Sequence, residues 1–150
     1  MAKNTIKIKK LVDNVEEFTA NAAITPGDLL QLMSTGKVRK HATVEGNALP
    51  VMFALEDELQ GYGITDNYSA NNQVQVWKCV PGEQVYARLK DGENVVIGDP
   101  LESAGDGTLR KHVPDAGSAI GIVYHNQIVA VAREALDLSS SSGAESTRRL

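Results

Sequence analysis

The segment QVQVWKCVPGEQVYARLKDGENVVI, residues 73–97, contains the clearest structural pattern in the sequence. Valines alternate with other residues over 73–80, which is the period of a strand with two different faces. The turn dipeptides Pro81-Gly82 and Asp91-Gly92 each separate two runs that are rich in β-forming residues. The pattern predicts a mainly β domain of short antiparallel strands joined by hairpins. The predicted strands here cover 73–80, 84–89 and 95–97.

An internal repeat occurs at an offset of 71 residues. The segment GDLLQLMSTGKVRKHATVEGNALPVMF (27–53) aligns without gaps to GDPLESAGDGTLRKHVPDAGSAIGIVY (98–124), with nine identities in 27 positions. Background composition would give about one or two. Pro100 and Gly105 disfavour a helix in the second segment, so both segments predict strand, tight turn, strand. Two such units suit a small barrel or sandwich with pseudo-twofold symmetry. The structural turn residues are Gly27, Asp28, Gly36, Gly98, Asp99 and Gly107.

Composition indicates one globular domain. The chain has 150 residues, of which 42% are hydrophobic and 23% are charged. A formal charge of −4 argues against a surface devoted to nucleic acid. A single cysteine excludes an intramolecular disulfide, no secretory signal is visible, and no apolar run is long enough to cross a bilayer. We therefore expect a protein made in the cytoplasm, with no membrane role.

The two ends of the chain differ from the middle. Residues 1–12 (MAKNTIKIKKLV) carry four lysines and no acid, and Ile6 and Ile8 alternate with lysines as in a strand. Residues 139–150 are polar, rich in serine and without periodicity. We expect an extended basic arm over 1–14, loosely held in the free protein, a β-rich domain over 15–138, and a flexible tail over 139–150.

Signatures of catalysis and of metal binding are missing from the sequence. Gly117-Ser118-Ala119-Ile120-Gly121 is not a nucleophile elbow, because its serine is misplaced. Cys79 lies in a predicted strand and is interpreted as a buried hydrophobic residue. The three histidines are dispersed, and the acidic run 56–58 is interpreted as a solvated loop. We expect no enzyme activity, no metal and no cofactor.

The repeat places Arg39-Lys40-His41 and Arg110-Lys111-His112 at equivalent positions. Two basic strands of this kind could form one phosphate-binding face together with the arm. In a strand, however, only the arginine and the histidine share a side, and seven aromatic residues in the chain make a poor stacking platform. A nucleic-acid-binding β-barrel is therefore the alternative function.

Several stretches together resemble the cement (decoration) proteins of tailed-bacteriophage capsids, functional relatives of the lambda-type head decoration proteins. The likeness covers most of residues 3–138 and rests on Gly-Asp turns and β patterning. The stretches are MAKN (1–4), PGD (26–28), PGEQVYARLKDG (81–92), GDPLES (98–103) and VAREALDLS (131–139).

The resemblance implies a β-barrel or β-tulip domain without an active site. It would form a homotrimer on the outer surface of the expanded capsid and join neighbouring major capsid proteins against the internal pressure of DNA. The basic arm would then add a strand to the capsid protein. The isoleucines would fill apolar pockets and the lysines would face acidic side chains. The candidate capsid-binding residues are Thr5, Ile6, Lys7, Ile8 and Lys9.

Overall fold

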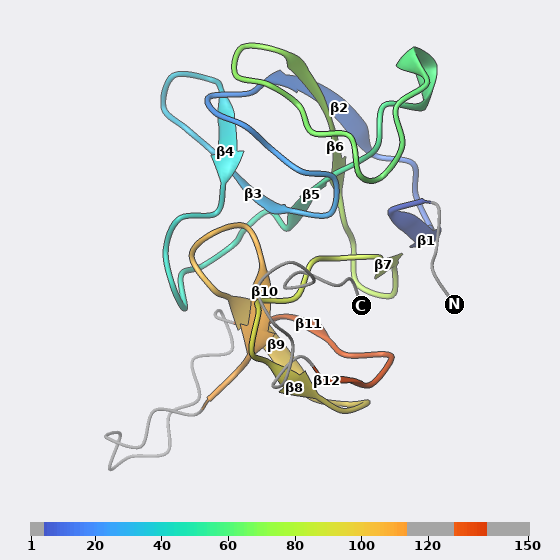
Figure 1. The fold of residues 1–150 in the computed structure, drawn as a ribbon, viewed down its shortest axis with the longest axis vertical. Helices are drawn as coiled ribbons and strands as arrows, with labels where there is room; N and C mark the ends of the chain where they lie inside the picture. Colours follow the sequence, from blue (N-terminus) through green and yellow to red (C-terminus); the bar gives the residue numbers. More distant parts are fainter. Residues whose placement is uncertain (1–4, 114–127, 138–150) are drawn as a thin grey trace.

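The structure, a computed structural model, describes residues 5–113 and 128–137. Within these ranges the chain forms short strands and a 3-10 helix, η1 (Figure 1). The predicted mainly β, antiparallel architecture is confirmed. The elements are β1 (Lys7–Lys9), β2 (Val15–Thr19), β3 (Leu29–Leu32), β4 (Val38–Lys40), β5 (Met52–Ala54), η1 (Glu58–Gln60), β6 (Gln73–Lys78), β7 (Gln84–Val85), β8 (Asn94–Val95), β9 (Pro100–Ser103), β10 (Leu109–Lys111), β11 (Ile128–Val131) and β12 (Leu136–Asp137).

A five-stranded antiparallel sheet, in the order β2-β6-β5-β3-β4, forms the upper part of the molecule in Figure 1. Its central strand β5 is buried along its whole length because both faces of the sheet are covered there. One face packs a cluster that includes Leu30, Val38, Met52 and Val76. The opposite face presents Leu29 and Phe53 to the rest of the domain. The period of two along each strand produces this division between the faces.

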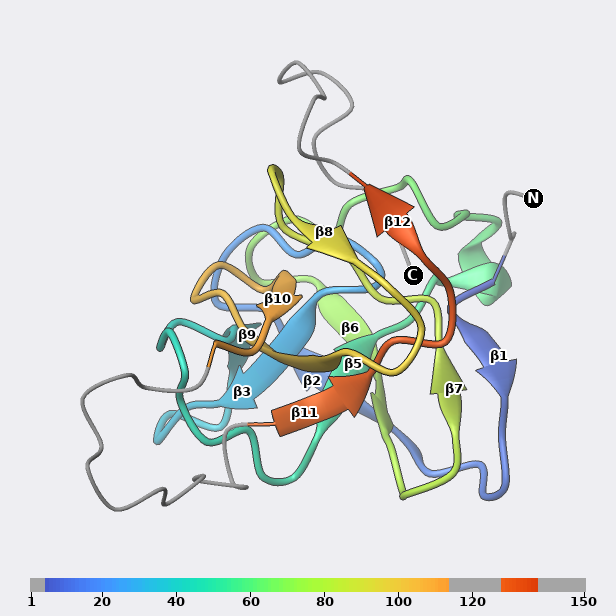
Figure 2. The ribbon, with the colours of Figure 1, turned by 90° about the horizontal axis from the view of Figure 1, so that it is seen from below.

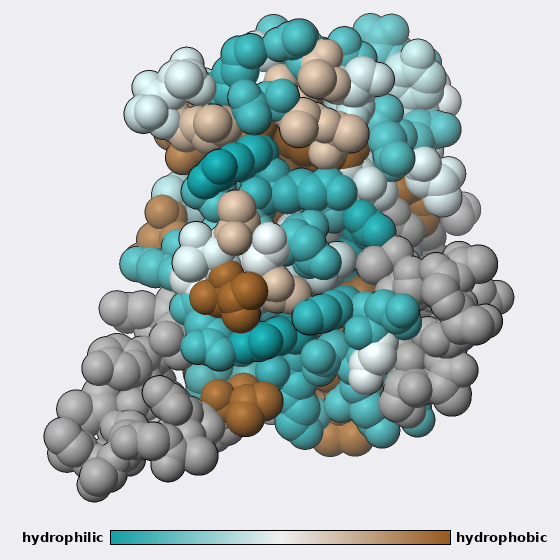
Figure 3. Space-filling view, turned by 60° about the vertical axis from the view of Figure 1, so that its left-hand side comes forward, coloured by the Kyte–Doolittle hydropathy of each residue, from teal (hydrophilic) through white to brown (hydrophobic). Residues whose placement is uncertain are grey.

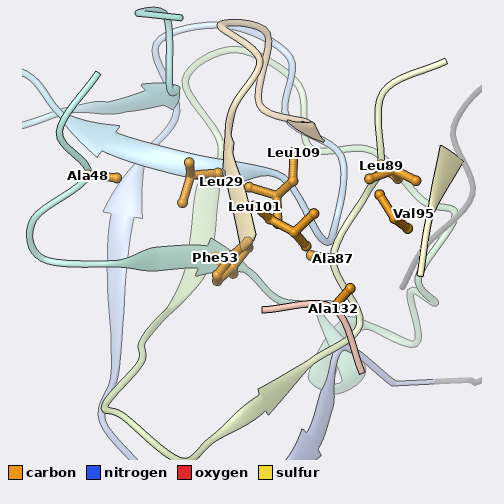
Figure 4. Packing of buried hydrophobic residues seen from close by; sticks show 9 residues of the cluster. All are labelled: Leu29, Ala48, Phe53, Ala87, Leu89, Val95, Leu101, Leu109 and Ala132. Carbon is orange, nitrogen blue, oxygen red and sulfur yellow. The ribbon is translucent and has the colours of Figure 1, made fainter. Parts of the chain in front are cut away.

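The described chain forms three smaller antiparallel sheets, which are ordered β10-β9-β11, β12-β8 and β1-β7 (Figure 2). The first two lie below the five-stranded sheet in Figure 1. None of the sheets formed by the described residues closes into a barrel. A shared apolar cluster joins the five-stranded sheet to the lower sheets, and Figure 4 shows its side chains converging from several strands. The cluster contains Leu29, Ala48, Phe53, Ala87, Leu89, Val95, Leu101, Leu109 and Ala132.

The strands around the two turn dipeptides exist, but the predicted hairpin pairing is wrong. β6 pairs with β2 and β5, and β7 pairs with β1 instead of with β6. β8 pairs with β12, near the C-terminal end of the described chain. Pro81-Gly82 and Asp91-Gly92 do turn the chain, since both glycines have positive φ. These strands pair with strands far away in the sequence, because the apolar faces against which they pack come from other parts of the chain.

The two segments of the repeat have matching secondary structure wherever both are described. β3 and β9 have equivalent bounds at the offset of 71, as do β4 and β10. Their registers also match, since Gln31 lies opposite Arg39 and Glu102 lies opposite Arg110. We call β3 with β4 the first hairpin, and β9 with β10 the second hairpin.

The third strand of the second unit does not lie where the gapless alignment places it. β5 pairs with β3 through Leu30 and Met52, and β11 pairs with β9 through the equivalent Leu101 and Ala130. β11 therefore occupies the place of β5, but it lies further along the chain than residue 124, where the alignment of 98–124 ends. Residues 114–127, which include the end of the second repeat segment, lie outside the described residues.

Candidate functional site

The predicted Gly-Asp turns form equivalent structures before the two hairpins. Gly27 and Gly98 have φ values of 94° and 96°, a region that favours glycine. Asp28 Oδ2 accepts a hydrogen bond from the main-chain N–H of Thr25 at 2.8 Å, and Asp99 Oδ2 accepts one from Val96 at 2.9 Å. Each aspartate thus closes its own turn.

The two aspartates differ in their surroundings. Asp28 is completely buried and also binds Arg88, with 2.9 Å between Oδ1 and Nη1, and Lys40, with 3.3 Å between Oδ2 and Nζ. Asp99 is partly exposed and pairs with Lys111 at 2.9 Å. Its pKa is lowered by the main-chain hydrogen bond from Val96 and by Lys111. Asp28 therefore joins the first hairpin to the segment around Arg88, whereas Asp99 acts locally.

The turn glycines Gly36 and Gly107 also differ in their packing. Both have positive φ, of 79° and 86°. A Cβ atom on Gly36 would meet nothing within 4 Å, whereas one on Gly107 would lie 3.1 Å from Asp28 Cγ and 3.1 Å from Lys40 Cβ. The Gly107 carbonyl also accepts a hydrogen bond from Leu29 N–H at 2.7 Å. The turn of the second hairpin is thus packed against the start of the first.

We expect Gly107→Ala to destabilise the domain more than Gly36→Ala. Both variants suffer the backbone strain of a positive φ, about 1 kcal/mol, and Gly107→Ala adds steric overlap for a total of about 2–3 kcal/mol. Urea unfolding of the two variants beside the parent chain measures the difference. Equal losses would contradict the close packing described for Gly107.

The histidines of the repeated tripeptides have structural hydrogen bonds. His41 Nε2 lies 3.2 Å from the carbonyl oxygen of Asn47, and Nδ1 lies 2.7 Å from Ser103 Oγ. Since a carbonyl only accepts, Nε2 carries the proton, and in the neutral ring Nδ1 accepts from the Ser103 hydroxyl. Ser103 has no exposed surface. This Ser-His pair therefore links the two hairpins inside the domain, away from any solvent-borne substrate.

The second hairpin contains a buried ionic cluster around Glu102, which has no exposed surface. Its Oε1 accepts from Arg110 Nε at 2.7 Å, and its Oε2 accepts from His112 Nδ1 at 2.5 Å. Arg110 also binds Glu45, with 2.6 Å between Nη2 and Oε1. The basic residues of this hairpin are consequently occupied by carboxylates of the same chain.

The prediction of a loosely held arm is wrong for residues 5–12. Ile6 is completely buried with Leu55 and Trp77, and its carbonyl accepts a hydrogen bond from Tyr86 N–H at 2.8 Å. β1 pairs with β7, with Lys7 opposite Val85. The domain itself thus supplies the apolar pocket that the sequence predicted for Ile6 on a partner.

The other arm residues have mixed environments. Thr5, Lys7 and Ile8 are half-buried, and Lys9 is exposed. The lysine charges are partly neutralised, since Asp13 pairs with Lys7 at 3.4 Å and with Lys10 at 3.1 Å. Hydrogen bonds from Lys10 and the charge of Lys7 lower the pKa of Asp13.

Glu83 anchors the end of the arm. Its Oε1 accepts main-chain N–H bonds from Leu11 at 3.1 Å and Val12 at 3.0 Å, and its Oε2 accepts one from Val80 at 2.8 Å. Desolvation alone would raise the pKa of Glu83, but these three donors lower it overall. The anchor is therefore fully present above the unfolded-state pKa and is lost as the pH falls through the folded-state pKa.

An apolar groove of about 790 Å³ lies beside the arm. Its floor belongs to the shared apolar cluster, and its lip includes the exposed side chains of Leu49, Val80 and Val131. Ile8 of β1 forms part of its wall. The apolar lining residues are Ile8, Leu49, Pro50, Val51, Phe53, Cys79, Val80, Pro81, Val85, Ala87, Leu89, Leu101, Leu109, Val129, Ala130, Val131 and Ala132.

Cys79 lies in the wall of this groove, and its thiol is a poor nucleophile. Burial, with a smaller contribution from the charge of Glu83, raises the pKa of its thiol to about 12. The thiolate is the reactive form, so Cys79 is inert near neutral pH. The sequence predicted a buried residue within a strand, whereas Cys79 is half-buried and directly follows β6.

The acidic run 56–58 is only partly a solvated loop. Glu58 is exposed, as expected, but Glu56 is buried and accepts a hydrogen bond from Ile6 N–H at 3.1 Å. Sequence reasoning missed Glu56, because nothing in the run itself shows that the arm covers one of its three carboxylates.

No cluster of three or more potential metal ligands occurs among residues 5–113 and 128–137. The helical content of those ranges includes no segment long and apolar enough to span a membrane. Comparison of the chain with protein-family models gave no match, and a search of curated proteins gave none.

Proposed function

We propose that the chain is a capsid decoration (cement) protein, a structural virion protein that binds the outer surface of the expanded phage capsid. It would join neighbouring major capsid proteins and associate with itself as a homotrimer. The carrying observation is the apolar groove of about 790 Å³ beside the edge strand β1. We also propose that the two hairpins belong to two copies of one ancestral unit within a barrel-like or tulip-like domain.

The groove suits an extended apolar segment of the major capsid protein. Leu49 is 74% exposed and Val131 is 53% exposed, so the lip offers apolar side chains to a partner. β1 has β7 as its strand partner within the described chain and lies at the edge of its sheet. A partner strand added at such an edge gains main-chain hydrogen bonds, and its alternate side chains enter the neighbouring groove.

A symmetric trimer would make this contact with the capsid several times. An individual groove of this size gives modest affinity, because association costs rotational and translational freedom. A trimer that engages several capsid proteins at once converts later contacts into intramolecular ones, which raises the overall avidity. This arrangement needs no catalytic group.

The nucleic-acid alternative is weakened by internal ion pairing. Lys40 pairs with Asp28, Lys111 with Asp99, and Arg110 with Glu102 and Glu45. Cations that are already neutralised release few counterions when they meet phosphate. Lys40, Lys111 and Arg110 are thus neutralised by carboxylates of the same chain, which reduces the positive charge available to a phosphate backbone.

We expect Leu49→Glu and Val131→Glu to weaken binding to purified expanded shells at least tenfold, which corresponds to about 1.4 kcal/mol. A charge in the lip would have to be desolvated when the apolar segment docks. Cosedimentation with shells measures the effect. Ile97→Glu serves as the matched control, since Ile97 is also exposed but lies outside the groove lining.

Parent-like binding by both lip variants would rule out the groove as the docking surface. Salt-dependent capture of a random oligonucleotide, with no binding to shells, would instead support the alternative function.

A further inference from the structure

The described chain contains two Asp-Gly pairs in turns. Asp91-Gly92 precedes β8, and Asp106-Gly107 joins β9 to β10. An Asp-Gly pair can rearrange without an enzyme, because the main-chain nitrogen of a glycine reaches the preceding carboxyl group with little steric hindrance. Both glycines have a positive φ, of 84° and 86°. Sequence and turn conformation therefore treat the two pairs alike, and only their surroundings separate them.

Water reaches both aspartates, since Asp91 and Asp106 are exposed. The turn at Gly107 lies beside Lys40 of β4, on a side of the molecule that is mainly hydrophilic (Figure 3). Exposure of the carboxyl group therefore does not distinguish the two pairs. The difference lies in how freely the glycine nitrogen can meet the carboxyl carbon.

The Asp106-Gly107 pair is held by its neighbours. Asp106 Oδ1 accepts hydrogen bonds from the main-chain N–H and from the hydroxyl group of Thr108. Gly107 is buried, its N–H donates to the carbonyl of His41 at 3.3 Å, and its carbonyl accepts from Leu29 N–H at 2.7 Å. Movement of the carboxyl carbon onto the Gly107 nitrogen would break several of these bonds, which costs free energy. The fold thus opposes a rearrangement at Asp106.

The Asp91-Gly92 pair has far fewer constraints. Gly92 is exposed, and a Cβ atom on it would meet nothing within 4 Å. Its N–H group makes no main-chain hydrogen bond within residues 5–113 and 128–137. The turn is closed by Glu93 N–H and the Lys90 carbonyl at 3.4 Å, which is long for a hydrogen bond. Figure 2 shows the loop before β8 extending away from the body of the domain, so a rotation of this backbone disturbs few contacts.

We propose that Asp91 is a site of spontaneous isomerisation to isoaspartate and that the fold protects Asp106 from the same reaction. The Gly92 nitrogen attacks Cγ of Asp91, and the hydroxyl group of the carboxyl leaves with the amide proton as water, which closes a succinimide ring. Water then opens the ring at either carbonyl. Attack at the side-chain carbonyl restores aspartate, whereas attack at the main-chain carbonyl leaves the chain running through the Asp91 side chain. No atom is gained or lost overall.

Isomerisation would alter the segment between two core residues. Leu89 and Val95 both belong to the shared apolar cluster, and isoaspartate adds one methylene group to the main chain between them. Glu93 accepts a hydrogen bond from Lys111 N–H at 3.2 Å, which joins this segment to β10. The modified turn would also present a free α-carboxyl group, the group on which isoaspartyl methyltransferases act. This chemistry goes beyond the proposed function and does not depend on it.

The test follows isoaspartate in the full-length chain during incubation at neutral pH, in buffer and in concentrated urea. Electron-transfer fragmentation of the digested protein distinguishes aspartate from isoaspartate at each position. In buffer, isoaspartate should form at residue 91 about tenfold faster or more than at residue 106, because residue 106 reacts only after local opening. In urea the two rates should become similar, since neither pair is then held by the fold.

Asp91→Glu is the control that leaves the glycine in place. Glutamate would have to close a larger ring, which is slower, so the variant should form no isoaspartate at 91 and keep the parent rate at 106. Labelling by an isoaspartyl methyltransferase with S-adenosylmethionine should fall in parallel, and thermal melting checks the fold of the variant. Equal rates at the two positions in buffer, no isoaspartate at 91, or a difference that persists unchanged in urea would overturn the proposal.

Discussion

Deletion of residues 2–10 is expected to lower the free energy of unfolding by about 3–5 kcal/mol. The deletion removes Ile6, which is completely buried with Leu55 and Trp77. It also removes the main-chain N–H of Ile6, which donates a hydrogen bond to Glu56. The buried carboxylate is then left without this hydrogen bond. Urea unfolding followed by fluorescence of the single tryptophan measures the loss.

Single substitutions separate the two isoleucines of the arm. Ile6→Ala should cost about 2–4 kcal/mol, because it leaves a cavity in a closed cluster. Ile8→Ala should cost less than about 1 kcal/mol, since Ile8 is half-buried in the wall of an open groove. An unchanged melting transition after deletion of 2–10 would show that the arm is loosely held, as its sequence alone predicts.

Asp28→Asn should be the more damaging of two equivalent aspartate substitutions, with a loss of about 3 kcal/mol. The change removes the charge that faces Arg88 and Lys40 in a fully buried position. The side chain of Arg88 is only 15% exposed, so water replaces the lost carboxylate poorly. The first hairpin would also lose its ionic link to the segment around Arg88.

Asp99→Asn is the matched control, because Asp99 closes the same turn at the offset of 71. Its ion pair with Lys111 is solvated, so a much smaller loss is expected. Thermal and urea unfolding of both variants provide the comparison. Equal sensitivity at the two positions would mean that the turn, and not the buried ion pair, makes Asp28 important.

Local signals in the sequence predicted the elements but not their partners. Alternation over 73–80 predicts a strand, and β6 is found there as Gln73–Lys78. Pro81-Gly82 correctly marks a change of direction, yet β6 and β7 belong to different sheets. A turn dipeptide fixes the φ angles of two residues, whereas strand pairing depends on which apolar face remains to be covered.

The candidate sites show the same limit. The repeat revealed the Gly-Asp turns and the two Arg-Lys-His strands, because identical residues at a fixed offset can be read directly. The sequence could not show that Glu102 neutralises Arg110 while Gln31 leaves Arg39 without a carboxylate. That difference depends on cross-strand register and on the loop that carries Glu45 to Arg110.

The sequence by itself determined the β class, the positions of most strands, the turns at Gly36 and Gly107 and the matching bounds of β3 with β9 and of β4 with β10. Each of these follows from side-chain periodicity or from the φ angles that glycine permits, which are properties of neighbouring residues. Only the tertiary structure decided that Ile6 belongs to the core, that Glu56 is buried and that an apolar groove stays open beside β1. Burial depends on surfaces contributed by residues far apart in the chain, so the pattern of one segment cannot specify what will cover it.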